Sequence, residues 1–80
     1  MEFTDLHMLL QAARVRRSLP SPTVRRALRE GADLSQGDLG AVLGVTESAV
    51  SRWESGRRAP RREHLDAYVA VLAALAREAV

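Results

Sequence analysis

Three hydrogen-bonding side chains, Ser48, Ser51 and Arg52, recur at a spacing that places them on one face of a short helix. At 100° per residue this face lies opposite Val50 and Trp53, which would hold the helix against a core. Hydroxyl and guanidinium groups on such a face can bind the edges of nucleic-acid bases, and arginine suits guanine in particular. The spacing therefore favours hydrogen bonding in a DNA groove, and the alternative is a helix face that is merely solvated.

Arginine supplies every strong cation of the chain, and the arginines are clustered. One cluster without an acidic residue comprises Arg14, Arg16, Arg17, Arg25, Arg26 and Arg29. A second comprises Arg57, Arg58, Arg61 and Arg62. Guanidinium groups pair with phosphate in a bidentate way, so both clusters could follow a nucleic-acid backbone. They could equally be solvated faces, or charges that complement the C-terminal ends of helices.

Length and composition argue against several other classes of protein. Eighty residues form one domain at most, and so small a core leaves little room for a deep catalytic cleft. The chain has no cysteine, and His7 and His64 are too isolated to suggest a metal site. No cluster of serine, histidine and acid indicates nucleophilic catalysis, so we expect neither an enzyme nor a cofactor. Without a long apolar stretch or a signal peptide, we expect a cytoplasmic protein that does not enter membranes.

Hydrophobic periodicity and capping residues predict an all-α chain of five helices. The predicted helices cover residues 4–17, 22–30, 36–43, 46–54 and 62–79. The expected N-caps are Thr4, Ser21, Ser35 and Thr46, and Gly31 is expected to end the second helix. We expect one domain over residues 1–80, with an additional N-terminal helix and linker in 1–20 and a core in 21–80.

Apolar residues indicate which faces of the helices meet. Four residues are expected to hold the angle between the third and fourth helices: Leu39, Val42, Val50 and Trp53. The apolar stripe of the first helix comprises Phe3, Leu6, Leu9, Leu10 and Ala13, and that of the last comprises Leu65, Tyr68, Val69, Leu72, Leu75 and Ala76. A glycine inside a helix costs roughly 1 kcal/mol relative to alanine, which predicts tight packing at Gly40. Gly37 carries the same cost with no evident reason.

The sequence from Gln36 to Pro60, QGDLGAVLGVTESAVSRWESGRRAP, contains a specific combination of residues. Its glutamine, leucine, turn glycine, serine, tryptophan-glutamate pair, glycine and proline fall in one register. In this it resembles the Cro and repressor (XRE) type of helix-turn-helix, over about residues 25–72. The resemblance implies a five-helix, lambda-repressor-like fold with a long C-terminal helix, and binding to double-stranded DNA.

The resemblance also implies roles for single residues. The base-reading residues would be Glu47, Ser48, Ser51 and Arg52. The phosphate-binding residues would be Gln36, Ser55, Arg57 and Arg58, joined by Arg61 and Arg62 at the start of the last helix. The family pairs the glutamate after the tryptophan with an arginine seven positions before the glutamine, which implies a partly buried ion pair between Arg29 and Glu54.

Two positions depart from the usual pattern of the family. Asparagine is frequent where Ser55 stands, and many members carry glutamine or serine where Glu47 stands. DNA phosphates repel an acidic side chain. Glu47 would therefore either accept a hydrogen bond from a cytosine amino group or pair with a cation such as Arg52, and the structural use is favoured.

These expectations describe a sequence-specific DNA-binding transcriptional regulator, either a repressor or a Cro-like switch. One short recognition helix reads only a few base pairs, so we expect a homodimer on operator half-sites. The N-terminal helix and residues 72–80 are both apolar enough to form the dimer surface. The alternative is an antitoxin-like or accessory protein whose N-terminal helix binds a partner protein.

Overall fold

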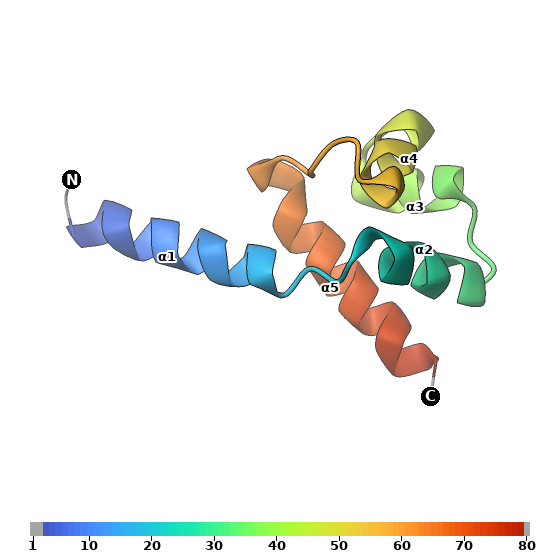
Figure 1. Ribbon diagram of the computed structural model, residues 1–80, viewed down its shortest axis with the longest axis horizontal. Coiled ribbons are helices and arrows are strands. Elements are labelled where there is room, and N and C mark those ends of the chain that lie inside the picture. The colour runs from blue at the N-terminus through green and yellow to red at the C-terminus, as the bar shows by residue number, and fades with distance from the viewer. Residues whose placement is uncertain (1–2, 80) are drawn as a thin grey trace.

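The computed structural model describes residues 3–79, and within that range the chain forms five helices and no strand. They are α1 (Phe3–Arg17), α2 (Pro22–Gly31), α3 (Gln36–Leu43), α4 (Glu47–Ser55) and α5 (Arg62–Glu78). Figure 1 shows α2, α3 and α4 gathered beside α5, while α1 extends away from them. The all-α prediction is confirmed. Within residues 3–79 no helix has the length and apolar character needed to cross a membrane.

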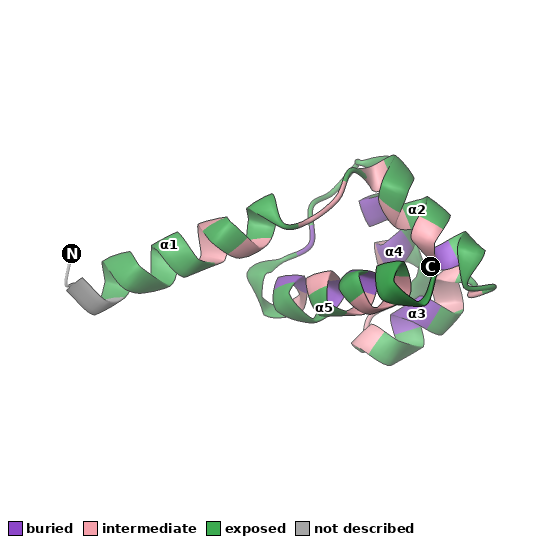
Figure 2. Ribbon diagram, turned by 90° about the horizontal axis from the view of Figure 1, so that it is seen from below, coloured by how far each residue is buried: buried purple, intermediate pink, exposed green. Residues whose placement is uncertain are grey.

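A small apolar core lies where α3, α4 and α5 meet. It consists of Leu39, Val50, Trp53, Tyr68 and Leu72. The rings of Trp53 and Tyr68 pack with their centroids 4.8 Å apart, a tilted arrangement that stabilises beyond the area it buries. Figure 2 shows buried positions on the facing sides of the helices and exposed positions along α1. The predicted core positions of Leu39, Val50 and Trp53 are confirmed.

The prediction that Val42 belongs to this core is wrong, because 67% of its side chain is exposed. The inner face of α3 is centred on Leu39 and Gly40, with Leu43 partly buried one turn further on. At 100° per residue, Val42 points roughly 110° away from the centre of that face. The choice between the two sides of α3 is set by Gly40, through which this helix approaches α4.

Side-chain caps fix where α2, α3 and α4 begin. The hydroxyl groups of Ser21 and Thr46 each accept a hydrogen bond from the backbone N–H three residues further on, at 3.4 and 3.1 Å. Ser35 caps α3 in the same way, at 2.9 Å. Pro22 occupies the first turn of α2, where its missing N–H is not needed. The N-caps predicted at positions 21, 35 and 46 are confirmed.

The end of α2 differs from the prediction. Gly31 lies inside the helix, and Asp33 takes the left-handed conformation, with φ of 58°. Aspartate adopts this conformation more readily than most residues because its short polar side chain bonds locally. The N–H groups of Asp33 and Leu34 donate to the carbonyl oxygens of Glu30 and Arg29. This turn brings the Leu34 carbonyl within 2.8 Å of the Arg29 guanidinium.

Helix α1 has two apolar faces, whereas the sequence predicts a single apolar stripe. The face beside α5 contains Met8, Ala12 and Val15. The predicted stripe lies on the other side, where Leu6, Leu9 and Leu10 are exposed. Thr4, the expected N-cap, lies inside α1 instead of preceding it. The side chains of residues 3 and 4, and residue 80, lie outside the described part of the chain.

Candidate nucleic-acid interface

A tight turn joins α3 to α4. Gly44 has φ of 71°, in the left-handed region that glycine adopts without a side-chain clash. A Cβ atom on Gly40 would lie 2.7 Å from the carbonyl oxygen of Val45, closer than carbon and oxygen can approach. The predicted tight packing at Gly40 is therefore confirmed. The turn and this close approach together set the direction in which α4 leaves α3.

The first turn of α3 is held by a capping box. The Ser35 hydroxyl accepts a hydrogen bond from the backbone N–H of Asp38, and the Asp38 carboxylate accepts one from the backbone N–H of Ser35, both at 2.9 Å. These bonds from Ser35 favour the ionised carboxylate and hold the pKa of Asp38 below its ordinary value. The box fixes the turn of helix from which Gln36 projects.

Helix α4 has one buried side and one exposed side. Val50 and Trp53 face inward, only 0 and 4% exposed. The exposed side consists of Glu47, Ser48, Ser51 and Arg52. The helix lies at an edge of the molecule in Figure 1, next to the loop that leads to α5. The division of faces agrees with the one expected from helical spacing, while the use of the exposed face in base reading stays a prediction.

A buried ion pair anchors the C-terminal end of α4 to α2. Arg29 donates from Nε to Glu54 Oε2 at 2.7 Å and from Nη2 to Glu54 Oε1 at 2.9 Å. Both side chains are over 90% shielded from solvent. Burial opposes ionisation of Glu54, but the hydrogen bonds from Arg29 and Gln36 outweigh it and lower the pKa of this carboxyl. The hydrogen bond to Glu54 raises the pKa of Arg29, so the pair stays charged.

Gln36, expected at the DNA backbone, is also held by Glu54. Its Nε2 atom donates to Glu54 Oε1 at 3.1 Å. A side-chain amide has two N–H donors, so one remains for another acceptor. The bond aligns the amide at the start of α3. Glu54 thus contacts side chains from both α2 and α3.

The loop after α4 folds back on the end of that helix. Gly56 takes the left-handed conformation, with φ of 76°. The backbone N–H groups of Arg57 and Arg58 approach the carbonyl oxygen of Arg52 at 3.0 and 3.3 Å. The hydroxyl of Ser55 donates to the same oxygen at 3.1 Å. A hydroxyl has a single proton, so Ser55 would have to rotate away from Arg52 before it could donate to a phosphate.

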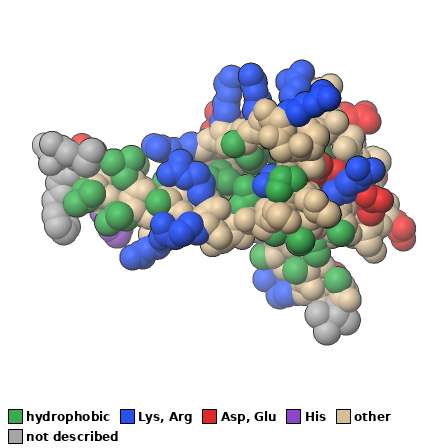
Figure 3. Space-filling model, in the orientation of Figure 1, with side chains coloured by type: hydrophobic (Ala, Val, Ile, Leu, Met, Phe, Trp, Pro, Cys, Tyr) green, Lys and Arg blue, Asp and Glu red, His purple; other side chains and the backbone are tan. Residues whose placement is uncertain are grey.

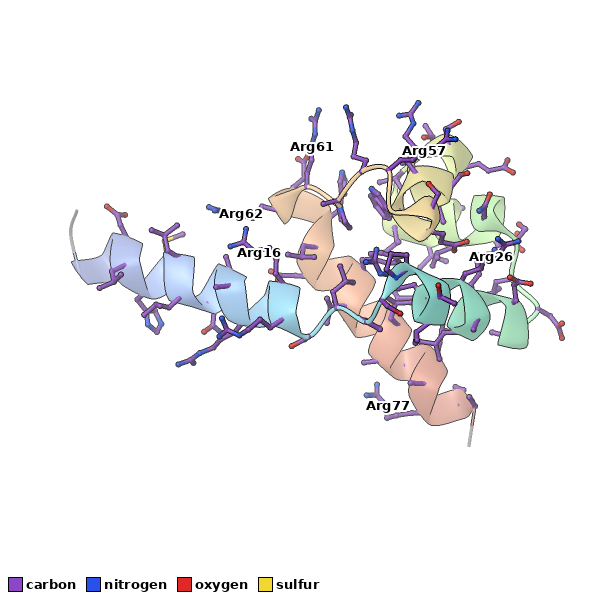
Figure 4. All side chains as sticks on the ribbon, in the orientation of Figure 1. Arg16, Arg26, Arg57, Arg61, Arg62 and Arg77 are labelled. Carbon is purple, nitrogen blue, oxygen red and sulfur yellow. The ribbon has the colours of Figure 1, made fainter. Side chains whose placement is uncertain are left out.

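The arginines predicted to bind phosphate do not all point the same way. Figure 4 shows Arg57 and Arg61 projecting from the loop on the side of α4, whereas Arg62 points toward α1. Arg62 lines the hollow between α1 and α5, together with Met8. Figure 3 shows several cationic side chains along the edge of the molecule that α4 and the loop form. Among the arginines predicted to bind phosphate, Arg62 therefore points toward α1, away from Arg57 and Arg61.

Three arginines converge on a hollow of about 180 Å³ between α4 and the start of α5. Arg52 comes from α4, Arg58 from the loop and Arg61 from the residue before α5. Trp53 and His64 line the same hollow, with ring centroids 6.2 Å apart. The structure thus brings a predicted base reader beside two predicted phosphate contacts. Among residues 3–79, no three acidic or histidine side chains gather closely enough to hold a metal ion.

Glu47 lies over the first turn of α3. A Cβ atom on Gly37 would lie 3.6 Å from Glu47 Oε2 and 3.7 Å from Ser35 Oγ. Both distances are ordinary van der Waals contacts, so packing does not require a glycine at position 37. The Glu47 carboxylate makes no ion pair with Arg52 in the described part of the chain. Glu47 is therefore an exposed residue at the border of the polar face of α4, with its carboxylate beside the first turn of α3.

Sequence reasoning left the role of Arg25 open between DNA binding and solvent. In the structure its Nε atom donates to the Pro20 carbonyl at 2.7 Å, and its Nη1 atom donates to the Trp53 carbonyl at 3.1 Å. The guanidinium also lies over the Tyr68 ring, 6.0 Å from its centroid. Arg25 therefore connects the linker, α4 and α5. No residue type marks such contacts in the sequence, because both acceptors are backbone carbonyls and that of Trp53 is 28 residues away.

Three comparisons relate the chain to known proteins. A helix-turn-helix family profile matches residues 26–75, which contain all of α3 and α4. A "Putative HTH-type transcriptional regulatory protein" of Methanosphaerula palustris is 58% identical over 33 residues, which are 41% of this chain. Those residues cover only 11% of that relative's length. No solved structure gave a match.

Proposed function

Since the chain belongs to the helix-turn-helix family of DNA-binding regulatory proteins, we propose that it binds operator half-sites as a homodimer and represses transcription by occupying them. Helix α4 is the recognition helix of this proposal, and α3 crosses the DNA backbone. The repressor assignment includes a Cro-like switch, in which occupancy of one operator selects between two promoters.

One observation carries the proposal: the exposed polar face of α4 borders the cluster of Arg52, Arg58 and Arg61. The opposite face of α4 is fixed in the core by Val50 and Trp53. A helix that is rigid on one side and polar on the other can present side chains to base edges without reorganising. Adjacent guanidinium groups supply the salt-dependent attraction to phosphates.

The side chains of this interface divide into two classes in the proposal. Ser48, Ser51 and Arg52 bind base edges, with arginine suited to guanine O6 and N7. The phosphate contacts are Gln36, through its second amide hydrogen, and the loop arginines Arg57, Arg58 and Arg61. Glu47 and Ser55 are secondary, because the Glu47 carboxylate lies beside the first turn of α3 and the Ser55 proton already binds a backbone carbonyl. Arg62 contributes through long-range charge alone.

Selection of bound DNA from a random pool is the experiment that tests the function. We expect an enriched site with twofold symmetry and half-sites about one helical turn apart, because two recognition helices related by a twofold axis read inverted sequences. Binding to that site should weaken with rising salt, with a slope of about −0.9 per phosphate neutralised. If no sequence is enriched and no complex forms at low salt, the proposal is wrong. A reporter gene behind the selected site then gives the regulatory sign.

Two arginine variants separate base reading from phosphate binding. Arg52→Ala should weaken binding to the selected site by about 1 to 3 kcal/mol and change binding to random DNA little. Arg58→Ala should weaken both and reduce the salt slope by about one phosphate. Arg77→Ala is the matched control, because this exposed arginine lies near the far end of α5 in Figure 4. Equal losses on both DNAs from Arg52→Ala would move Arg52 to the phosphate-binding class.

A further inference from the structure

Exposed apolar surface is concentrated on α1. Six large apolar side chains in the described part of the chain are exposed: Leu6, Met8, Leu9, Leu10, Val24 and Val42. Four of the six belong to α1, although this helix provides only 15 residues. In Figure 3 the arm formed by α1 carries a group of apolar side chains away from the rest of the molecule. Contiguous apolar surface of this kind marks an interaction site more often than scattered single residues do.

Three of the exposed residues, Leu6, Leu9 and Leu10, form a stripe with the half-buried Ala13 on the side of α1 opposite Ala12 and Val15. At 100° per residue, Leu6, Leu9, Leu10 and Ala13 fall within about 100° of one another. The residues that line the hollow against α5, Met8, Ala12 and Val15, lie on the opposite side of the helix. Ala12 and Val15 are partly buried on the α5 side, although Met8 beside them is 61% exposed. Leu9, at the edge of the stripe, borders a second hollow that Arg62 also lines. Leu6 and Leu10, which are 45 and 52% exposed, are the most open part of the stripe.

Charges along α1 are arranged so that the helix complements itself in the reverse direction. Asp5 lies in the first turn, and Arg14, Arg16 and Arg17 lie in the last. Asp5 and Arg16 are about 20° apart by helical spacing, on the flank of the stripe nearer to α5, where Asp5 also lines a hollow with Arg62 of its own chain. In an antiparallel pair related by a twofold axis, Asp5 of each copy lies beside Arg16 of the other copy, which gives two equivalent charge pairs. A parallel pair would instead bring the arginine-rich ends together.

Side-chain sizes along the stripe agree with the same arrangement. If the twofold axis passes between Leu9 and Leu10, the leucines of one copy pack on those of the other. Leu6 then faces Ala13 of the second copy, so that a large side chain meets a small one. Alternation of large and small residues across facing positions is what allows two helices to interdigitate.

We propose that the apolar stripe of α1 (Leu6, Leu9, Leu10 and Ala13) binds the same stripe of a second copy in an antiparallel helix pair. The inference rests on the proposed function in one respect, because operator half-sites call for two copies. Helix α1 is about 22 Å long by its residue count, too short to bury the roughly 800 Å² per partner of a standard stable interface. The pair is therefore weak in free solution, and adjacent half-sites on DNA strengthen it by raising the effective concentration.

Disulfide trapping tests both the surface and its direction, and the chain has no cysteine of its own to interfere. Leu6→Cys and Ala13→Cys chains, distinguished by a C-terminal tag, are mixed and oxidised. We expect the mixed disulfide to form several-fold faster than either self-disulfide, because the two positions face each other only in the antiparallel pair. Val24→Cys is the matched control, because Val24 is 46% exposed but lies on α2. Circular dichroism checks that each variant folds.

The outcomes separate this inference from the proposed function. Trapping no faster than that of Val24→Cys overturns the antiparallel pair, as does preferential self-trapping of Leu6→Cys. If the parent chain stays monomeric at high concentration and on operator DNA, then α1 is not a self-association site. In that case the apolar stripe of α1 binds a partner protein instead. If the chain crosslinks as expected but enriches no DNA, the proposed function fails and this inference stands. Sedimentation of Leu10→Lys with operator DNA, against Val24→Lys, should show loss of the second copy.

Discussion

Replacing Glu54 by alanine should strongly destabilise the protein. The change removes two hydrogen bonds to Arg29, at 2.7 and 2.9 Å, and one to Gln36 at 3.1 Å. Arg29 would keep only its bond to the Leu34 carbonyl, at 2.8 Å, among the contacts of its guanidinium. A guanidinium cannot lose its proton to escape burial, so the folded state would hold an uncompensated charge.

The magnitude follows from the burial of the pair. Removing one partner of a buried ion pair costs about 3 to 5 kcal/mol, because the remaining charge is left without compensation. The total stability expected for a chain of this length is only about 4 to 12 kcal/mol. Each kcal/mol lowers the melting temperature of so small a domain by about 4 to 8 °C. Glu54→Ala should therefore melt at least about 12 °C below the parent chain, or be unfolded at room temperature.

Thermal unfolding followed by circular dichroism at 222 nm measures the loss. Glu30→Ala is the matched control, because it breaks the pair between Arg26 and Glu30, which has the same 2.7 Å separation but side chains that are 64 and 55% exposed. An exposed pair contributes about 1 kcal/mol at most, so this variant should melt close to the parent. Equal melting temperatures for Glu54→Ala and Glu30→Ala would refute the structural role of the buried pair.

Lowering the pH should abolish the stabilisation that the Arg29–Glu54 ion pair gives to the fold. The pKa of Glu54 is lower in the folded chain than its ordinary value of 4.5, so ionisation of this carboxyl stabilises the fold above that value. The stabilisation is lost as the pH falls through the lower folded-state pKa. The difference in unfolding free energy between the parent and Glu54→Gln should be constant near neutral pH and should shrink below about pH 4.5. Subtracting the two curves cancels the similar contribution of Asp38.

Two further predictions concern packing. Gly40→Ala should destabilise the fold by about 1 to 3 kcal/mol, because the new Cβ would lie 2.7 Å from the Val45 carbonyl oxygen. In Gly37→Ala the new Cβ would meet its nearest neighbour at an ordinary 3.6 Å, so this variant should be neutral or stabilising by up to about 1 kcal/mol. Urea unfolding measures the stability of both variants. Arg25→Ala should destabilise by about 1 to 3 kcal/mol through loss of its hydrogen bond to the Trp53 carbonyl, and should leave the salt slope of DNA binding unchanged. A reduced slope would show that Arg25 binds phosphate after all.

Features set by neighbouring residues could be predicted from the sequence. The caps at Ser21, Ser35 and Thr46 depend on a hydroxyl and an N–H three residues apart, which any helix start provides. The left-handed turns at Gly44 and Gly56 depend on the absence of a side chain. The inward face of α4 was predictable because this short helix has just one apolar side.

Features that depend on the docking of whole helices could not be predicted in this way. In α3 the apolar residues occupy more than one side, and periodicity cannot tell that Gly40 faces α4 while Val42 faces solvent. In α1 two opposed apolar faces are both consistent with helical spacing, so periodicity indicates the stripe through Leu6 and Leu10 but not that Met8, Ala12 and Val15 are the residues beside α5. The end of α2 was predicted at Gly31 because glycine is the stronger local signal, and nothing in the sequence marks Asp33 as the left-handed residue of the turn that follows.

Glu54 belongs to the helix that is proposed to read bases, α4, and contacts Gln36, which is proposed to bind phosphate. Its carboxylate accepts hydrogen bonds from Arg29 of α2 and from Gln36 at the start of α3. The second of these bonds orients the Gln36 amide. A shift of this carboxylate would therefore move the proposed phosphate contact and the recognition helix together. Because the pair is buried and bidentate, it resists such a shift more firmly than a surface contact would. A chain of this size thereby obtains a rigid interface from one charged cluster beside a core of few apolar residues.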